Sequence, residues 1–375
     1  MMTLSNPIIV LTSRKGIAVK LPEQIGILTA TVGSYPKPKY LYPKSGRSLL
    51  DSFGFSFAAN EQNIGELEFN ALLDQAAMTA INDQTLAGID IITDGEERRG
   101  HYVLSVIDRL AGIDTKNLKN ISMRGGTVER MAPRVTGKVA YKRPIVAEEY
   151  SYSRSQTNKL IKISLPGPST VVDCVANEYY QNDKVQLAYD YADAIRTEVT
   201  SLIRAGCRVI QFDDPVLLRY PDEARQWGLK ALESCFAGCE DQATFVVHIC
   251  RGYPDKPLEK KGVKYKADQN YYSDILAWLS KSKLDIVSIE GAQGKLDLAV
   301  LSAIGDKTVM LGVLDIGDNR VETVQELVAR GQEALRYLPR EQLILAPDCG
   351  MIELSRRSAK EKLSNLAAAA QLLKK

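Results

Sequence analysis

The chain has 375 residues, of which 45% are hydrophobic and 25% charged, and its formal net charge is +2. This composition is typical of a globular protein with a large core, and the balanced charge gives no indication of a nucleic-acid or membrane-surface partner. The N-terminal residues lack the basic region, apolar core and cleavage site of a signal peptide, and no apolar run approaches the roughly 18 residues that span a bilayer. We therefore expect a cytoplasmic protein.

Short apolar runs alternate with longer amphipathic stretches, which is the pattern of repeated strand–helix units. Eight runs are expected strands: residues 25–32, 88–94, 160–165, 207–213, 244–250, 284–290, 308–315 and 342–347. Helices are expected at residues 66–87, 184–205, 222–236, 271–282, 294–304, 321–338 and 354–375. Eight such units predict an α/β fold, a (β/α)8 TIM barrel that forms a single domain over residues 1–375.

Two segments interrupt this rhythm. Residues 100–159 separate the second and third strands, and the stretch TVERMAPRVTGKVAYKRPIVAEEY within them predicts a β-hairpin insertion. Residues 251–269 form a lysine-rich loop after the fifth strand. Such a loop is most often a solvated face, although it could also meet an acidic ligand or partner.

Ionisable and metal-binding side chains concentrate at the predicted C-terminal strand ends, where barrels of this kind place their active sites. His248 and Cys250 end the fifth strand and point to the same face, since they are two residues apart. Taken alone, this pair is more often a buried thiol beside a hydrogen-bonded histidine than a metal site.

Glu290 and Cys349 follow the sixth and eighth strands, so that all four side chains could converge. The alternatives are a paired strand-end carboxylate and a small turn cysteine. Two thiolates, one imidazole and one carboxylate make a tetrahedral set suited to one Zn²⁺ ion per chain. The six cysteines are widely spaced, which favours metal ligation, catalysis or burial over a disulfide framework.

Such a zinc site would be electron-rich, because its three anionic ligands outnumber the two charges of the ion. It would activate water poorly and would suit a substrate thiol held as the reactive thiolate. Glu290 is the ligand that we expect a thiol to displace most easily.

Three further strand-end residues indicate an amino-acid substrate. Glu96 and Asp213 could bind an ammonium group, although pairing with nearby arginines is an equal alternative. Ser34 offers a hydroxyl and a loop of backbone N–H groups for a carboxylate, or it belongs to an ordinary turn. Together these residues fit an amino acid that carries a thiol.

The motifs VGSYPKP, DGEERR, LPGPST, QFDDP, VHIC, SIEG, GVLDI and PDCG follow one another as in the catalytic barrel of cobalamin-independent methionine synthases, and nearly the whole chain resembles that family. The resemblance implies a zinc-dependent transfer of a methyl group to the thiol of L-homocysteine, which forms methionine. The implied zinc ligands are His248, Cys250, Glu290 and Cys349. The implied homocysteine contacts are Val32, Gly33, Ser34, Glu96 and Asp213, and Asp213 is the one candidate for a catalytic role beyond the metal site.

The chain departs from the family pattern where the methyl donor binds. The family has a second, N-terminal barrel that helps to hold the folate, whereas this chain is one barrel long. Cys174, Arg219 and Gly317 stand where the family has a folate-stacking tryptophan, a folate-contacting glutamate and a proton-donating histidine. A methyl group on the folate nitrogen needs that nitrogen protonated before it leaves, whereas a methylcorrinoid needs no acid. We therefore expect methylcobalamin, free or on a corrinoid protein partner, as the donor in place of methyltetrahydrofolate.

Other functions remain compatible with this sequence. A related thiol alkyltransferase could load coenzyme M, but its sulfonate would favour cationic groups where Glu96 and Asp213 stand. A sulfonium compound such as S-methylmethionine, or a folate, could be the donor. A zinc-binding barrel without catalysis is the alternative from a different class.

Overall fold

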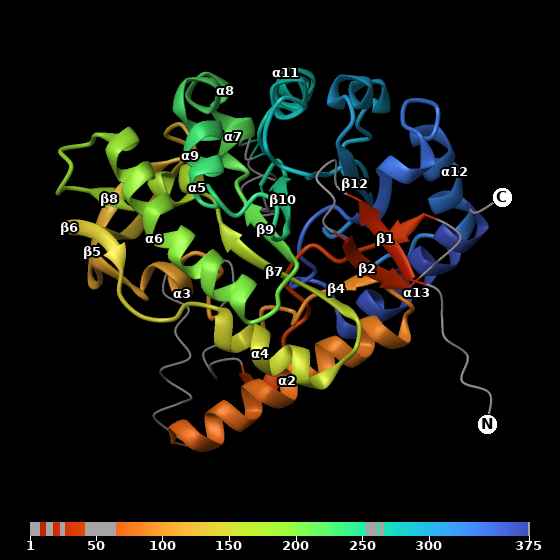
Figure 1. Ribbon diagram of the computed structural model, residues 1–375, viewed down its shortest axis with the longest axis horizontal. Helices are drawn as coiled ribbons and strands as arrows, with labels where there is room; N and C mark the ends of the chain where they lie inside the picture. The colour runs from red at the N-terminus through yellow and green to blue at the C-terminus, as the bar shows by residue number, and fades with distance from the viewer. Residues whose placement is uncertain are drawn as a thin grey trace.

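A ring of eight parallel strands forms the centre of the protein (Figure 1). The computed structural model describes residues 8–12, 18–22, 27–41, 65–252, 262 and 266–373. The strands are β3 (Leu28–Thr29), β4 (Ile91–Ile92), β7 (Leu160–Pro166), β9 (Val209–Asp213), β10 (Thr244–Ile249), β11 (Ile286–Ile289), β12 (Thr308–Leu314) and β13 (Leu343–Pro347). Their spatial order is β3, β13, β12, β11, β10, β9, β7, β4, and a parallel bridge between Ala30 and Ile91 closes the ring. The predicted barrel is confirmed, and each of the eight predicted runs contains one strand.

Helical segments lie in each of the seven predicted amphipathic stretches, whereas the helix at Ala147–Gln156 was not predicted and begins within the expected hairpin stretch. The longer ones are α2 (Glu66–Leu86), α4 (Ala147–Gln156), α6 (Lys184–Arg204), α11 (Tyr272–Leu279), α12 (Val324–Ala334) and α13 (Arg356–Leu372). Two of their starts show clear side-chain caps: Asp183 accepts hydrogen bonds from two backbone N–H groups of α6, and Thr323 forms a capping box with Glu326 at α12.

Shorter helical segments complete the ring, and two of them differ from the expected regular helices. They include α3 (Leu104–Ile107), α5 (Pro168–Asp173), α7 (Val216–Arg219), α8 (Pro221–Glu223), α9 (Leu229–Ser234), η1 (Lys39–Leu41), η3 (Gln269–Tyr271) and η5 (Arg340–Gln342). The predicted helix at 222–236 contains a π-helical turn, η2 (Ala224–Gly228), and the one at 294–304 is the 3₁₀ helix η4 (Leu298–Ile304).

The barrel interior changes from apolar to polar along the strands. Val209, Val246 and Ile286 belong to a small apolar cluster inside the ring. Two residues later on the same strands, and so on the same face, stand Gln211, His248 and Ser288, all buried. Polar side chains therefore gather at the C-terminal end of the barrel interior, above an apolar floor.

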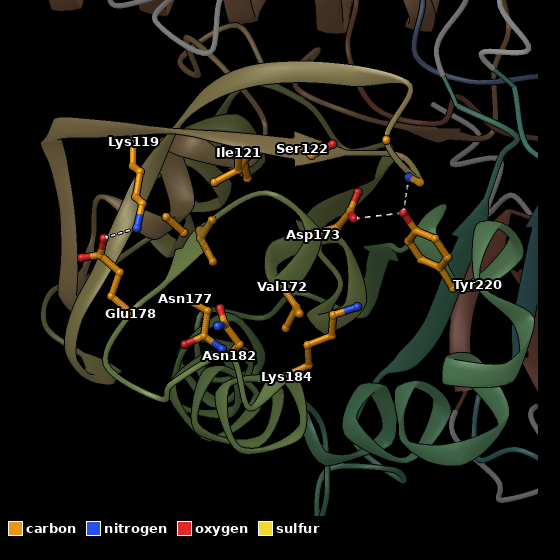
Figure 2. Close-up of a pocket in the computed structure, with 14 residues that line it drawn as sticks. Lys119, Ile121, Ser122, Val172, Asp173, Asn177, Glu178, Asn182, Lys184 and Tyr220 are labelled. Atoms are coloured by element: carbon orange, nitrogen blue, oxygen red, sulfur yellow. Dashed lines mark hydrogen bonds and ion pairs between the residues drawn. The ribbon is translucent and has the colours of Figure 1, made fainter.

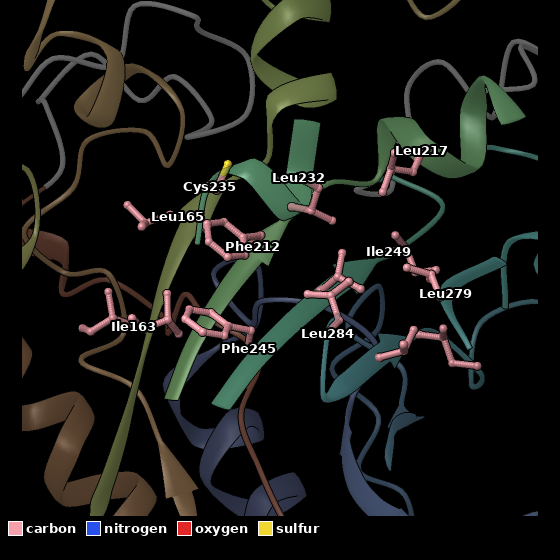
Figure 3. Close-up of a cluster of buried hydrophobic side chains, with 14 of the residues drawn as sticks. Ile163, Leu165, Phe212, Leu217, Leu232, Cys235, Phe245, Ile249, Leu279 and Leu284 are labelled. Carbon is pink, nitrogen blue, oxygen red and sulfur yellow. The ribbon is translucent and has the colours of Figure 1, made fainter. Parts of the chain in front are cut away.

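The opposite faces of the strands pack against the helices in a larger apolar core (Figure 3). Phe212 on β9 and Phe245 on β10 both stack with Phe236, which follows α9, with ring centroids 5.9 and 4.2 Å apart. This aromatic contact holds the α9 segment against the two strands that carry Asp213 and His248.

The predicted insertion is a long antiparallel hairpin of β5 (Leu110–Met123) and β6 (Val128–Tyr141), and β6 also pairs with the short strand β8 (Ala176–Asn177). Figure 1 shows the hairpin beside the barrel. The carboxylate of Glu198 on α6 accepts hydrogen bonds from the backbone N–H groups of residues 145, 146 and 147, which fixes the returning chain. At the tip, the N–H of Gly125 donates to the hydroxyl of Tyr220 at 2.7 Å. The hairpin therefore reaches from the second βα unit to the segment after β9.

A second hairpin, β1 (Ile8–Thr12) with β2 (Ala18–Pro22), was not predicted, because the strand–helix repeat gives it no place. Most of the lysine-rich loop, residues 253–261 and 263–265, lies outside the described residues. Among the described residues, no helix has the length and apolar character needed to cross a membrane.

Candidate active site

Three of the predicted metal ligands lie together at the C-terminal end of the barrel. His248 is in β10, Cys250 directly follows β10, and Cys349 follows β13 by one residue. One ligand atom from each of these side chains lies within 4.8 Å of the others. The two sulfurs are 3.8 Å apart, and both cysteines are free thiols. Strands that are far apart in the sequence thus bring two sulfurs and an imidazole to one point.

The hydrogen bonds of this cluster favour a metal ligand set. Nδ1 of His248 lies 2.8 Å from the hydroxyl of Ser288, whereas its buried Nε2 has no hydrogen-bond partner among the described residues. A hydrogen bond on one ring nitrogen is the usual way in which proteins orient a metal-binding imidazole. The bond from Cys349 lowers the pKa of Cys250 well below its ordinary value, while the same bond and burial raise the pKa of Cys349. Two sulfurs and an imidazole nitrogen without a hydrogen-bond partner among the described residues fit a soft divalent ion such as Zn²⁺.

Glu290, the fourth predicted ligand, directly follows β11 and lies outside this group of three. Both of its carboxylate oxygens are 3.1 Å from Nζ of Lys266, and Nε of Arg251 is 3.6 Å away. Burial raises the pKa of Glu290 to about 7, against the opposing effect of Lys266. The carboxylate of Glu290 therefore has two cationic neighbours. It follows β11, the strand next to β10, which leads to His248 and Cys250.

Asp348 connects the two strand ends that carry Glu290 and Cys349. Its carboxylate is fully buried and accepts hydrogen bonds from the N–H groups of Gly291, Ala292 and Gln293, at 2.9, 2.9 and 2.6 Å. These three residues directly follow Glu290, and Asp348 directly precedes Cys349. One side chain thus fixes the backbone on both sides of the site.

Of the two predicted ammonium-binding acids, Glu96 is buried and Asp213 is half-buried. Glu96 accepts a hydrogen bond from the hydroxyl of Ser164 at 2.5 Å and lies 3.8 Å from Arg99, so that it is only partly paired. Asp213 accepts a bond from Nε2 of Gln211 at 2.7 Å. Burial raises the pKa of Asp213 to about 7, although the charge of His248 opposes that shift.

The loop of Val32, Gly33 and Ser34 contacts Glu96 on one side and the turn after Cys349 on the other. A Cβ added to Gly33 would lie 2.6 Å from Oε1 of Glu96, so that only glycine lets this loop come so close to the carboxylate. The carbonyl of Ser34 accepts a hydrogen bond from the N–H of Met351 at 2.7 Å, which ties the loop to the turn after Cys349. The five predicted substrate residues therefore lie around one region beside the sulfur–imidazole cluster.

Several residues of this site were missed by the sequence reasoning, above all Lys162. This buried lysine of β7 donates to Oε1 of Gln211 and lies 3.8 Å from the sulfur of Met310, and burial lowers its pKa to about 7. Gln211 in turn joins Lys162 to Asp213. The alternation of polar residues in LIKISL and VIQFD was the signal that could have revealed this layer.

A cavity of about 500 Å³ lies between the hairpin and the start of α6 (Figure 2). Tyr220 and Asp173, which are 3.4 Å apart, border it on the side toward the barrel. Both lysines that line it form ion pairs: Lys119 with Glu178, and Lys184 with Glu223, the last residue of α8. None of the predicted metal or substrate residues lines it.

Comparisons with known proteins agree with this architecture. Residues 27–372 match the family model of the catalytic domain of cobalamin-independent synthase. The methionine synthases of Sulfurisphaera tokodaii and Saccharolobus solfataricus are 28% and 29% identical to the chain, cover 94% and 92% of it, and are themselves covered to 94%. The structure of a B12-independent methionine synthase from Shewanella sp. W3-18-1 in complex with selenomethionine is 30% identical, with a TM-score of 0.83 over 92% of this chain and 97% of that one.

These matches correct the predicted methyl donor. Methylcobalamin and a methylated corrinoid protein are wrong, because the matched family works without cobalamin. The prediction depended on Cys174, Arg219 and Gly317, which replace the folate-binding and proton-donating side chains of the family. At Gly317, an added Cβ would lie 2.3 Å from Nε2 of Gln293, whose carboxamide reaches this place from the loop after β11. A polar group from another element can therefore occupy the space that a missing side chain leaves.

Proposed function

Since the chain belongs to the cobalamin-independent methionine synthase family, whose members are methyltransferases that act on homocysteine, we propose that it transfers a methyl group to the homocysteine thiol at a zinc site. The ligands in this proposal are His248, Cys250 and Cys349, with Glu290 as the fourth. The convergence of two sulfurs and one imidazole within 4.8 Å is the observation that carries it. Zinc bound there would lower the pKa of the substrate thiol and keep it as a nucleophilic thiolate.

The protein's own groups would hold the amino-acid part of the substrate. We assign the ammonium group to Glu96 and Asp213, and the carboxylate to the backbone N–H groups and hydroxyl around Ser34. The raised pKa of Asp213 suits this role, because a cationic substrate favours the ionised form. The Shewanella relative was solved in complex with selenomethionine, the selenium analogue of the expected product, which supports an amino-acid ligand for this chain.

For the donor we propose methyltetrahydrofolate, which needs no cobalamin. Supporting contacts come from two arginines beside the cysteine strand end. A Cβ added to Gly252 would lie 3.3 Å from Nη1 of Arg124, at the hairpin tip, and 3.4 Å from Nη2 of Arg219. Two guanidinium groups that meet at one backbone position suit the carboxylates of a folate glutamate tail.

The test is methionine formation from homocysteine by the zinc-loaded protein, with methyltetrahydrofolate, S-methylmethionine and methylcobalamin offered separately. We expect turnover with the folate, in its monoglutamate or polyglutamate form, and none with methylcobalamin. Turnover with methylcobalamin alone would overturn the proposed donor.

The ligand set has its own test in Cys349→Ser, which should lose zinc and activity together while its far-ultraviolet circular dichroism stays that of the wild type. Cys239→Ser is the matched control, since Cys239 contacts Thr200 at 3.9 Å on the helical side of the fold. Full zinc content in the Cys349 variant would remove that residue from the ligand set.

A further inference from the structure

Glu290 lies between the proposed metal ligands and a cationic side chain. On one side lie the sulfur–imidazole residues, of which Cys250 directly follows the neighbouring strand. On the other side, Nζ of Lys266 is 3.1 Å from both carboxylate oxygens. The pair is well shielded from solvent, because the side chains of Lys266 and Glu290 are only 13% and 2% exposed. Lys266 comes from the lysine-rich loop, to which the proposed reaction gives no role.

We propose that Lys266 is a positioning residue for the metal site: its ammonium competes with the metal ion for the carboxylate of Glu290, and so favours exchange of Glu290 for the substrate thiolate. The inference rests on the proposed function, since it requires both a metal ion and a thiol substrate.

The charges explain why such a competitor is needed. When a substrate thiolate joins Cys250, Cys349 and Glu290, four anionic groups surround an ion with two positive charges. Thiolates are the softer ligands and suit zinc well, so that the carboxylate is the group to leave. A released carboxylate at a 2% exposed position is costly without a counter-charge, and Lys266 and Arg251 provide one.

The position of Lys266 is itself held in place. Its ammonium also donates to Oε1 of Gln293, and Nε2 of Gln293 donates to Asp315 at 2.6 Å. The backbone N–H of Gln293 is fixed by Asp348. The competing cation is thus held by the same turn that follows Glu290, so that little reorganisation is needed for the carboxylate to remain with it.

Two binding measurements on the full chain test this inference. Zinc affinity is measured without homocysteine, by competition with a chromophoric chelator. Homocysteine affinity is measured on the cobalt-substituted protein, from the change in its visible absorption. For Lys266→Met we expect zinc to bind about fivefold more tightly and homocysteine about fivefold more weakly, as for the loss of one ion pair. Lys266→Arg keeps the charge and should restore most of both values.

Lys283→Met is the matched control, because Lys283 pairs with Glu240 at the surface and should change neither value. In a Glu290→Gln background, Lys266→Met should also change neither, since the shared carboxylate is gone. Weaker zinc binding in Lys266→Met would mean a merely structural lysine and would overturn the inference, as would an effect that persists beside Glu290→Gln. Failure of the proposed function looks different, because the wild-type cobalt spectrum would then not respond to homocysteine at all.

Discussion

Asp348→Asn tests whether one carboxylate holds the two strand ends of the proposed metal site together. Oδ1 of Asp348 accepts two backbone N–H bonds and Oδ2 accepts the third, from Gln293. The amide of asparagine keeps one oxygen, and its NH₂ group then faces the partly buried N–H donor of Gln293. Losing one charge-assisted bond and leaving that donor unpaired costs about 4 kcal/mol. Burial raises the pKa of Asp348, so that the neutral amide recovers part of its desolvation cost, and we expect a net loss of about 2 kcal/mol.

The assay is urea unfolding of the chelator-treated protein at neutral pH, which separates the hydrogen bonds from any bound metal. Asp297→Asn is the control, because the exposed Asp297 caps η4 with a single bond and asparagine caps equally well. A loss for Asp348→Asn within about 0.5 kcal/mol, the range of ordinary surface substitutions, would refute the reasoning. A second measurement, zinc affinity, should fall in Asp348→Asn and stay unchanged in the control.

Two further substitutions test the charges around the site. Glu97→Gln should flatten the dependence of stability on pH. Burial raises the pKa of Glu97 from 4.5 to about 7, so that between these pH values the folded protein keeps a proton that the unfolded chain releases. The wild type therefore loses stability as the pH rises from 4.5 to about 7. Urea unfolding at pH 5 and pH 8 should show about 3 kcal/mol less loss in the variant, and equal losses would contradict the assignment. Glu96→Gln should raise the KM for homocysteine about tenfold or more with zinc content unchanged, as expected for a hydrogen bond to a charged group; an unchanged KM would remove Glu96 from the ammonium site.

The barrel could be predicted from the sequence because buried parallel strands read as short apolar runs, and because eight of them separated by helices match the repeat of this fold. The meeting of His248, Cys250 and Cys349 followed from the same rule, since the C-terminal ends of all strands share one face. The local geometry was out of reach in the 3₁₀ turns of η4 and the π-helical turn in η2, where packing decides between helix types that share one sequence pattern.

The predicted donor was wrong for a related physical reason. A side chain that is present at a strand end occupies a known place, because the strand fixes its direction. A side chain that is absent says nothing about which group from another element fills that space. Gln293 comes from the loop after β11 and approaches Gly317 after β12, a contact that no local pattern contains.

The cations of the site could not be predicted either, because they come from elements other than those of the acids. They also explain how several acids can lie close together there. The acids at the strand ends are visible in the sequence, but the groups that balance them come from elsewhere. His248 on β10 and, to a smaller extent, Lys162 on β7 lower the pKa that burial gives Asp213 on β9, and Lys266 does the same for Glu290. Burial and these cations together leave each of the two acids with a pKa of about 7. Under the proposed function, each carboxylate would exchange its present partners for the ammonium group of a substrate or for a metal ion. For Asp213 and Glu290, the cation that allows this exchange is therefore as much a part of the site as the acid itself.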